Sequence, residues 1–207
     1  TKVTYKMFPE REVASVAGTH TKEYNKAMAT PTGIVIDMLS TSGEYNQKEI
    51  LISDILESVL DQLYTKTIRE DEGGTYGVGV NVGISRYPKV RRVLSIQFQT
   101  EPTKTEKLNA LALKGLDEIA KDGPNEEYFT KAVKNLAKEH AESLRKNGYW
   151  LGQLSTYYLH SLDFVSNYDA ILNSIKPEDV KAFVQSLYSS KDRIIITFRS
   201  TDTEAKK

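Results

Sequence analysis

An arginine and a tyrosine stand seven positions apart on either side of a double glycine, in the stretch TIREDEGGTYGVGV at residues 67–80. The guanidinium of Arg69 carries several N–H donors in a planar fork, and the phenol of Tyr76 carries a further donor. Gly73 and Gly74 permit the positive backbone angles that reverse a chain, so both side chains can face one point. An ordinary explanation also fits, because arginine complements a helix C-terminus, glycine ends helices and tyrosine favours strands. These residues alone leave both interpretations open.

The three histidines do not form a recognisable metal site. HTKEY at residues 20–24 comes within one residue of the HxxEH zinc pattern, but Tyr24 stands where the second imidazole is needed. We therefore interpret His20 as a solvated loop residue. His140 falls on the apolar stripe of a predicted helix and is expected to be buried, and His160 has no acidic partner at ligand spacing.

Other familiar catalytic arrangements are also missing from the sequence. The chain has no cysteine, which excludes thiol nucleophiles and disulfides but leaves the compartment undecided, and it has no GxSxG elbow. The segment GGTYGVG lies after a predicted helix and before a predicted strand. A phosphate loop requires the reverse order, in which a strand leads into a helix N-terminus, so we reject that interpretation.

Two further clusters have both a functional and a structural explanation. RYPKVRR at residues 86–92 is basic enough to touch nucleic acid or an acidic substrate, but a hairpin tip also needs charge to stay soluble, and we favour the latter. The aromatic group Tyr149, Trp150, Tyr157 and Tyr158 has the surfaces to stack on a ligand, yet its near-helical spacing favours packing.

The composition indicates a globular protein without an excess of either positive or negative charge. The 207 residues are 39% apolar, with 28 basic and 28 acidic side chains and a formal net charge of zero. This balance argues against nucleic acid or an anionic membrane surface as partner, and no apolar run reaches the ~18 residues of a membrane span. The polar opening TKVTYK has neither a signal peptide nor an initiating Met, so we expect an excised piece of a longer protein.

Hydrophobic periodicity predicts strands and helices along most of the chain. Strands are expected at 32–40, 75–84, 93–101 and 193–198, and residues 12–18 read as a strand or a linker. A long helix is expected at 46–69, ending near Gly73, with Asn46 and Glu49 as a capping box. Further helices are expected after a capping box of Thr103 and Glu106, around residues 133–144, and from Pro177, with Asn147-Gly148 as an interruption. This order predicts an α+β fold, a mostly antiparallel sheet with a layer of helices packed on it.

The strand at 75–84 has one nearly bare face. Tyr76 alternates in step with the valines, whereas Gly77, Gly79 and Gly83 occupy most of the opposite face. Either a close-packed helix lies against the glycines, or the face accommodates the backbone of a ligand.

These segments resemble the second half of the pitrilysin/insulinase family of inverted-motif zinc metalloendopeptidases. LYTKTIREDEGGTYGVGVNVGISRYPK is similar to that family's arginine and tyrosine segment, and the similarity continues through IQFQTEP, LRKNGYWLGQL, IKPEDVKAFVQSLY and RIIITF, over about residues 28–198. REDEGGTYGV together with KNGYW is the most specific part. The resemblance is strongest to long bacterial members with several homologous domains, of which this chain would be the last.

The resemblance implies a function for the opening motif. It implies a two-halved clamshell, in which the first half carries zinc on HxxEH and the second closes over an extended peptide substrate. Arg69 and Tyr76 would reach the substrate carbonyl near that zinc and stabilise the oxyanion. If no helix packs on it, the glycine-lined face at Gly77 and Gly79 is where the peptide backbone would bind. The expected partners are therefore the N-terminal zinc-binding half and an unfolded or extended peptide.

One departure from the family pattern limits this chain's role. The helix at 46–69 stands where a zinc-bearing domain has HxxEH, yet it reads KEILISDILES without histidine. We therefore expect no metal or cofactor in this chain and no peptidase activity from it alone. Two alternatives remain open: a non-catalytic scaffold member of the same family, and a free-standing peptide binder that uses the aromatic group.

The expected organisation has three parts. Residues 1–27 form a linker or a first strand, 28–200 form the family's C-terminal αβ domain, and 201–207 form a polar tail. The resemblance to bacterial members suggests a parent enzyme in the periplasm or cell envelope.

Overall fold

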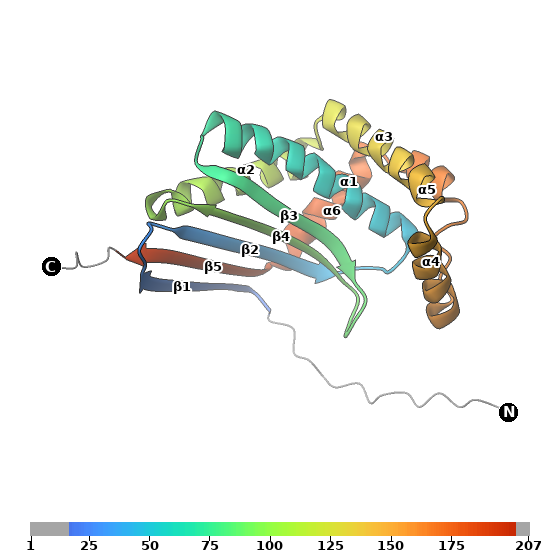
Figure 1. The fold of residues 1–207 in the computed structure, drawn as a ribbon, viewed down its shortest axis with the longest axis horizontal. Helices are drawn as coiled ribbons and strands as arrows, with labels where there is room; N and C mark the ends of the chain where they lie inside the picture. Colours follow the sequence, from blue (N-terminus) through green and yellow to red (C-terminus); the bar gives the residue numbers. More distant parts are fainter. Residues whose placement is uncertain (1–16, 202–207) are drawn as a thin grey trace.

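The computed structural model describes residues 17–201, which form a five-stranded sheet with helices on one side (Figure 1). The strands are β1 (Thr19–Ala27), β2 (Gly33–Ser42), β3 (Thr75–Ser85), β4 (Arg91–Thr100) and β5 (Asp192–Thr201), in the spatial order β1-β5-β2-β4-β3. Only β1 and β5 pair in parallel among these strands; the other pairs are antiparallel. The predicted α+β class and mostly antiparallel sheet are confirmed.

The helical layer contains six α-helices within the described range. They are α1 (Gln47–Tyr64), α2 (Thr105–Asp122), α3 (Glu126–Ser143), α4 (Asn147–His160), α5 (Tyr168–Ser174) and α6 (Pro177–Ser190). A π-helical turn, η1 (Thr65–Asp71), extends α1, and a 3-10 turn, η2 (Pro102–Lys104), precedes α2. Figure 1 shows α4 extending from one end of the molecule, away from the helices that lie along the sheet.

The core lies between the sheet and α1, α2 and α6. Alternate residues of β2 and β4 are buried there, including Val35, Leu94 and Ile96, and they meet the fully buried Ile55 and Leu60 of α1. The opposite sheet face has no helix over it in the range that the structure describes (Figure 1). This one-sided arrangement explains the alternating burial of β2 and β4.

One ion pair ties the neighbouring strands β2 and β5 together on the core face of the sheet. Asp37 of β2 is fully buried, and its Oδ1 accepts a hydrogen bond of 2.8 Å from Nε of Arg193 of β5. The second carboxylate oxygen accepts from the guanidinium as well, which gives a bidentate pair. Both oxygens of a buried carboxylate are therefore satisfied by one cation.

The helix starts were predicted with mixed success. Asn46 caps α1 as expected, since its Oδ1 accepts from the amide of Glu49 at 2.9 Å. The capping box of Thr103 and Glu106 is wrong, because η2 occupies Pro102–Lys104 and α2 begins only at Thr105. Pro102 favours that tight turn, because its fixed φ suits a first helical residue.

The N-terminal segment contains a strand that the sequence left unresolved. The described part of residues 1–27 forms β1, an edge strand whose residues are all exposed. Without a buried face it shows no alternation of apolar and polar residues, so periodicity could not reveal it. Most of the possible strand at 12–18 lies outside the described residues.

Candidate functional site

Arg69 lies on the exposed side of η1, where α1 leaves the core. Ile68 beside it is fully buried, as is Tyr64 one turn earlier, whose phenol donates to the carbonyl of Ala112 at 2.8 Å. These anchors fix the helical turn, whereas the Arg69 side chain is exposed and has no hydrogen bond or ion pair within residues 17–201. Its guanidinium is available to a partner from outside the domain.

The double glycine turns the chain from η1 into β3. Gly73 adopts φ +55°, a left-handed conformation that favours glycine. Gly74 is buried against α2, and a Cβ at this position would lie 2.9 Å from Cδ1 of Leu108. The first glycine therefore reverses the chain and the second allows the strand to approach the helix. The structure thus bears out the chain reversal expected at this point.

A β-bulge at the start of β3 decides where Tyr76 lies. Thr75 pairs with Thr100 and Val78 with Phe98, so Tyr76 and Gly77 together stand opposite Gln99. The extra residue breaks the alternation, and Tyr76 is 99% exposed. The expectation that Tyr76 shares the face of the valines is therefore wrong. Its phenol, like the guanidinium of Arg69, has no partner among the described residues.

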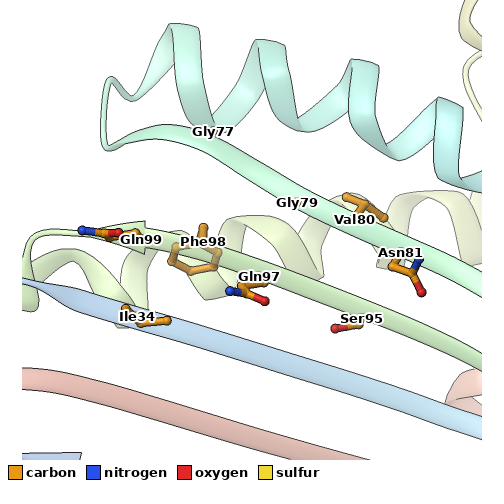
Figure 2. Close-up of a pocket in the computed structure, with 9 residues that line it drawn as sticks. All are labelled: Ile34, Gly77, Gly79, Val80, Asn81, Ser95, Gln97, Phe98 and Gln99. Carbon is orange, nitrogen blue, oxygen red and sulfur yellow. The ribbon is translucent and has the colours of Figure 1, made fainter.

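The glycines of β3 border a shallow groove on the open sheet face (Figure 2). The groove measures about 380 Å³ and is lined by Ile34, Gly77, Gly79, Val80, Asn81, Ser95, Gln97, Phe98 and Gln99. A Cβ at Gly77 would meet nothing within 4 Å, and at Gly79 only the carbonyl of Gln97 at 3.6 Å. No helix of the described chain packs on these glycines, which rules out the close-packed alternative there.

The predicted site residues thus gather around one corner of the domain. Tyr76 directly precedes Gly77, and Gly79 follows along the same strand, all at the end of β3 that is joined to η1. Arg69 lies on η1 across the Gly73 turn, and η1 packs against β3. The amide groups of Gln97 and Gln99, together with Asn81, add hydrogen-bonding groups that the sequence analysis did not single out. Gln97 and Gln99 alternate with buried residues along β4, and this alternation is the sequence signal that could have placed them on the open face.

Helices α1 and α3 enclose an acidic pocket, on the helix where the resemblance led us to look for HxxEH. Asp54, Glu57 and Asp61 of α1 face Glu139 of α3 around a space of about 380 Å³. Burial, followed by the charges of Glu57 and Glu139, raises the pKa of Asp54 to about 6. Within residues 17–201 no three histidine, cysteine or acidic side chains are placed to hold a metal ion. The donor set therefore does not fit the family's zinc.

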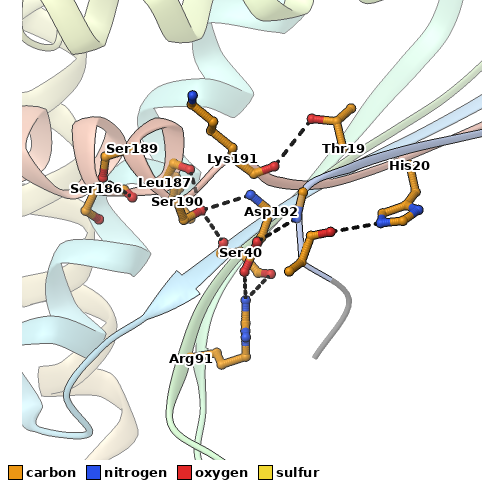
Figure 3. A network of polar contacts seen from close by, with 12 residues as sticks. Thr19, His20, Ser40, Arg91, Ser186, Leu187, Ser189, Ser190, Lys191 and Asp192 are labelled. Carbon is orange, nitrogen blue, oxygen red and sulfur yellow. Dashed lines mark hydrogen bonds and ion pairs between the residues drawn. The ribbon is translucent and has the colours of Figure 1, made fainter. Parts of the chain in front are cut away.

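The basic cluster and His20 have structural partners (Figure 3). Arg91 donates to Oδ2 of Asp192 at 2.7 Å and to Ser40 at 2.9 Å, which links β4, β5 and β2. Arg92 forms a bidentate pair with Glu49 of α1. The expectation of solvated charges at a hairpin tip is therefore wrong for these two arginines. His20 is exposed as expected, but it lies on β1 rather than on a loop, and its Nε2 lies 3.0 Å from the carbonyl of Ala17.

The remaining histidines and aromatic residues divide into buried and exposed sets. His140 is 9% exposed and stacks on Tyr168 with ring centroids 3.6 Å apart, as the predicted burial requires. His160, the last residue of α4, lies 6.3 Å from the ring of Tyr87. Tyr149 packs edge-on against His140, and Trp150, 39% exposed, lies against Tyr149, as expected. Tyr157 and Tyr158 are 52% and 79% exposed, so the expectation of packing within this domain is wrong for these two.

Comparison with known protein families identifies the family of this chain. Residues 15–136 match the family described as the Peptidase M16 inactive domain. The chain belongs to this family. In this M16 domain the match includes α1, the Gly73 turn and β3, which carry the predicted site residues. The resemblance to the pitrilysin/insulinase peptidases is thereby confirmed.

Individual relatives support the same assignment. The chain is 26% identical over 116 residues to the zinc protease PQQL-like of Arabidopsis thaliana, over 54% of this chain and 12% of that protein. The periplasmic protease PqqL of Escherichia coli superposes with a TM-score of 0.76 at 14% identity, over 91% of this chain and 21% of that one. A peptidase M16 inactive domain from Pseudomonas fluorescens gives 0.71 at 18%, over 93% and 45%. The chain therefore spans about an eighth to a half of these proteins.

Proposed function

We propose that this M16 domain closes over an extended peptide and presents Arg69 and Tyr76 to a peptide carbonyl in a zinc endopeptidase whose metal belongs to another segment. The observation that carries the proposal is the exposure of both side chains at one corner without a partner in the described chain. β-bulges are over-represented next to active sites, where they re-aim a side chain, and the bulge here accompanies a Tyr76 side chain that is 99% exposed.

The two side chains suit a carbonyl oxygen that gains negative charge. When a peptide carbonyl is attacked, its oxygen becomes an oxyanion, and donors already aimed at it stabilise the transition state. One such donor is worth about 3 kcal/mol in a site from which water is excluded. The guanidinium of Arg69 is able, in addition, to hold a backbone carbonyl of the substrate in place.

The groove beside Tyr76 suits the backbone of an extended peptide. Gly77 and Gly79 add no side-chain bulk, while Asn81, Gln97 and Gln99 supply amide donors and acceptors along the same surface. An extended chain needs such groups at intervals of about two residues, which is the spacing at which a strand displays side chains on one face. The groove supports a peptide ligand better than a compact small molecule.

The zinc chemistry would come from another segment. The relative from Arabidopsis thaliana is named a zinc protease, but the acidic residues of α1 do not fit a zinc site here. We expect metal analysis of the isolated 207-residue chain to find no stoichiometric zinc. About one tightly bound zinc per chain would contradict the proposal that another segment holds the metal.

The proposal is tested with Tyr76→Phe in a polypeptide or complex that contains both this domain and a zinc-bearing half. Loss of one oxyanion donor should lower turnover by about 100-fold while zinc content stays unchanged. Tyr24→Phe, at the opposite edge of the sheet, is the matched control and should retain full turnover. Full activity of the Tyr76 variant would refute the role of its hydroxyl.

A further inference from the structure

Arg69 has no ion-pair partner within residues 17–201, although an acidic run follows it directly. Glu70 and Asp71 end η1, and Glu72 is its C-cap with helical backbone angles. On a helix, side chains one or two positions apart point in different directions, whereas those three positions apart are neighbours. Glu72 is therefore the acidic residue of this run whose spacing suits an ion pair with Arg69.

Glu72 instead pairs with a lysine of α2. Its Oε2 accepts a hydrogen bond from Nζ of Lys107, and the part of the chain that the structure describes gives this carboxylate no second ion pair. Lys107 belongs to α2, whereas Arg69 lies on the exposed side of η1. The pair with the lysine therefore directs the carboxylate towards α2 and away from the guanidinium.

Two contacts hold α2 against η1. Leu108, next to Lys107, is 1% exposed and packs against Gly74, where an added Cβ would lie 2.9 Å from Cδ1 of the leucine. One turn further along α2, the carbonyl of Ala112 accepts the hydrogen bond from the buried Tyr64. These contacts lie beyond the two ends of η1, so the lysine is held beside the C-cap.

The wide turn of η1 gives Arg69 no advantage over the lysine as a partner for Glu72. A π-helix closes its hydrogen bonds over five residues rather than four, so each residue turns the chain by less than the 100° of an α-helix. Side chains three positions apart are then further from alignment than on an α-helix. The position of Lys107 therefore decides which way the Glu72 carboxylate points.

We propose that Lys107 is a positioning residue for Arg69: by holding Glu72, it keeps the guanidinium free for a peptide carbonyl. This inference rests on the proposed function, because that function assigns Arg69 to the carbonyl. Lys107 itself touches no substrate and acts through Glu72.

The size of the effect follows from the exposure of the ion pair. The side chains of Lys107 and Glu72 are 63% and 31% exposed. An ion pair in contact with solvent to this degree shifts an equilibrium by about two- to fivefold. Without the lysine, Glu72 pairs with Arg69 in a fraction of the molecules, and the apparent affinity for peptide falls with the fraction that stays free. Saturating peptide displaces Glu72, so turnover at saturation is unaffected.

Steady-state kinetics on a polypeptide or complex that contains both this domain and a zinc-bearing half test the inference. Lys107→Ala should raise KM for an extended peptide about two- to fivefold and leave kcat unchanged. Thermal melting should detect little change, because an exposed ion pair contributes little to the stability of the fold. A role in the fold alone does not predict a rise in KM without a change in kcat.

Three further variants separate the effect of the charge from that of the side chain. Lys107→Arg keeps a cation beside Glu72 and should retain the wild-type KM. Adding Glu72→Gln to Lys107→Ala removes the carboxylate that would pair with Arg69, and it should restore the KM. Lys114→Ala is the matched control, because Lys114 lies on the same helix and pairs with the exposed Glu118 rather than with η1.

The isolated 207-residue chain gives a second readout that does not depend on peptidase activity. In nuclear magnetic resonance spectra of Lys107→Ala, the Nε–H signal of Arg69 should shift and exchange more slowly with water, because a carboxylate now binds the guanidinium. Adding Glu72→Gln should reverse both changes. An unchanged Arg69 signal in Lys107→Ala would overturn the inference, as would a raised KM that Glu72→Gln does not reverse.

Arg69→Ala keeps the failure of this inference distinguishable from the failure of the proposed function. If Arg69→Ala leaves turnover and KM unchanged, the proposed function fails at this residue and the positioning role of Lys107 fails with it. If Arg69→Ala impairs hydrolysis but Lys107→Ala leaves both KM and the Arg69 signal unchanged, the proposed function stands and only the inference is overturned.

Discussion

The hydroxyl of Thr75 lies 2.6 Å from the carbonyl oxygen of Gln99, the residue that faces the β-bulge. The same hydroxyl also accepts from the amide of Gly77 at 3.2 Å, so one side chain holds both ends of the bulge. This contact connects the fold to the proposed site, because the bulge is what directs Tyr76 away from the core.

The first prediction concerns this hydroxyl. Thr75→Val keeps the shape of the side chain but removes its hydrogen bonds, so it should lower the free energy of unfolding by about 1 kcal/mol. In an assembly that contains a zinc-bearing half, it should also lower turnover, since Tyr76 is no longer held. Urea denaturation and peptide hydrolysis measure the two effects. Thr75→Ser retains the hydroxyl and should behave as wild type; equal loss in both variants would contradict the argument.

The second prediction separates stability from binding at the glycines. Gly79→Val adds a side chain to the floor of the groove, where the space is open, and valine favours strands. We therefore expect unchanged or slightly higher thermal stability together with at least tenfold weaker binding of an extended peptide, measured by fluorescence anisotropy. Gly83→Val is the control, because Gly83 lies on the same strand with nothing within 4 Å of its Cβ position and does not line the groove. Equal binding by the two variants would exclude the groove as the peptide site.

The third prediction concerns the buried ion pair. Asp37→Ala removes the carboxylate and leaves the guanidinium of Arg193 without its partner in the core, which should cost about 3–5 kcal/mol of unfolding free energy. Chemical denaturation measures this loss. Glu118→Ala, which breaks an exposed pair with Lys114 on α2, should change stability by less than about 0.5 kcal/mol. A small effect at Asp37 would show that the pair contributes little.

The fourth prediction follows from the raised pKa of Asp54. Burial and the charges of Glu57 and Glu139 raise the pKa of this carboxyl from 3.8 to about 6, so the folded state binds the proton more tightly than the unfolded state. Stability from this group is fully present below about pH 4 and is lost as the pH rises to about 6. Asp54→Asn should therefore stabilise the domain at pH 7.5 by about 1–3 kcal/mol relative to wild type, and by much less at pH 4. Urea denaturation at both pH values gives the difference, and equal effects at the two would contradict the assignment.

The sequence by itself determined the class of fold and most of its elements. Regular apolar spacing located α1, α2, α6 and the strands β3 and β4, because burial on one side imposes a period that can be read directly, and runs of β-branched residues located β2 and β5. The absence of histidine on α1 likewise separated this chain from a zinc-bearing domain. The edge strand β1 could not be found in this way, since all its residues are exposed.

The tertiary structure decided which surfaces are free. Whether the glycines of β3 meet a helix, and whether the aromatic residues of α4 pack inside the domain, depends on where distant elements dock rather than on local spacing. The outward position of Tyr76 depends on a bulge, which arises from the register between β3 and β4 and leaves no period in either strand. Register is a relation between two segments, so only the folded chain could reveal that Arg69 and Tyr76 lie exposed beside an open groove.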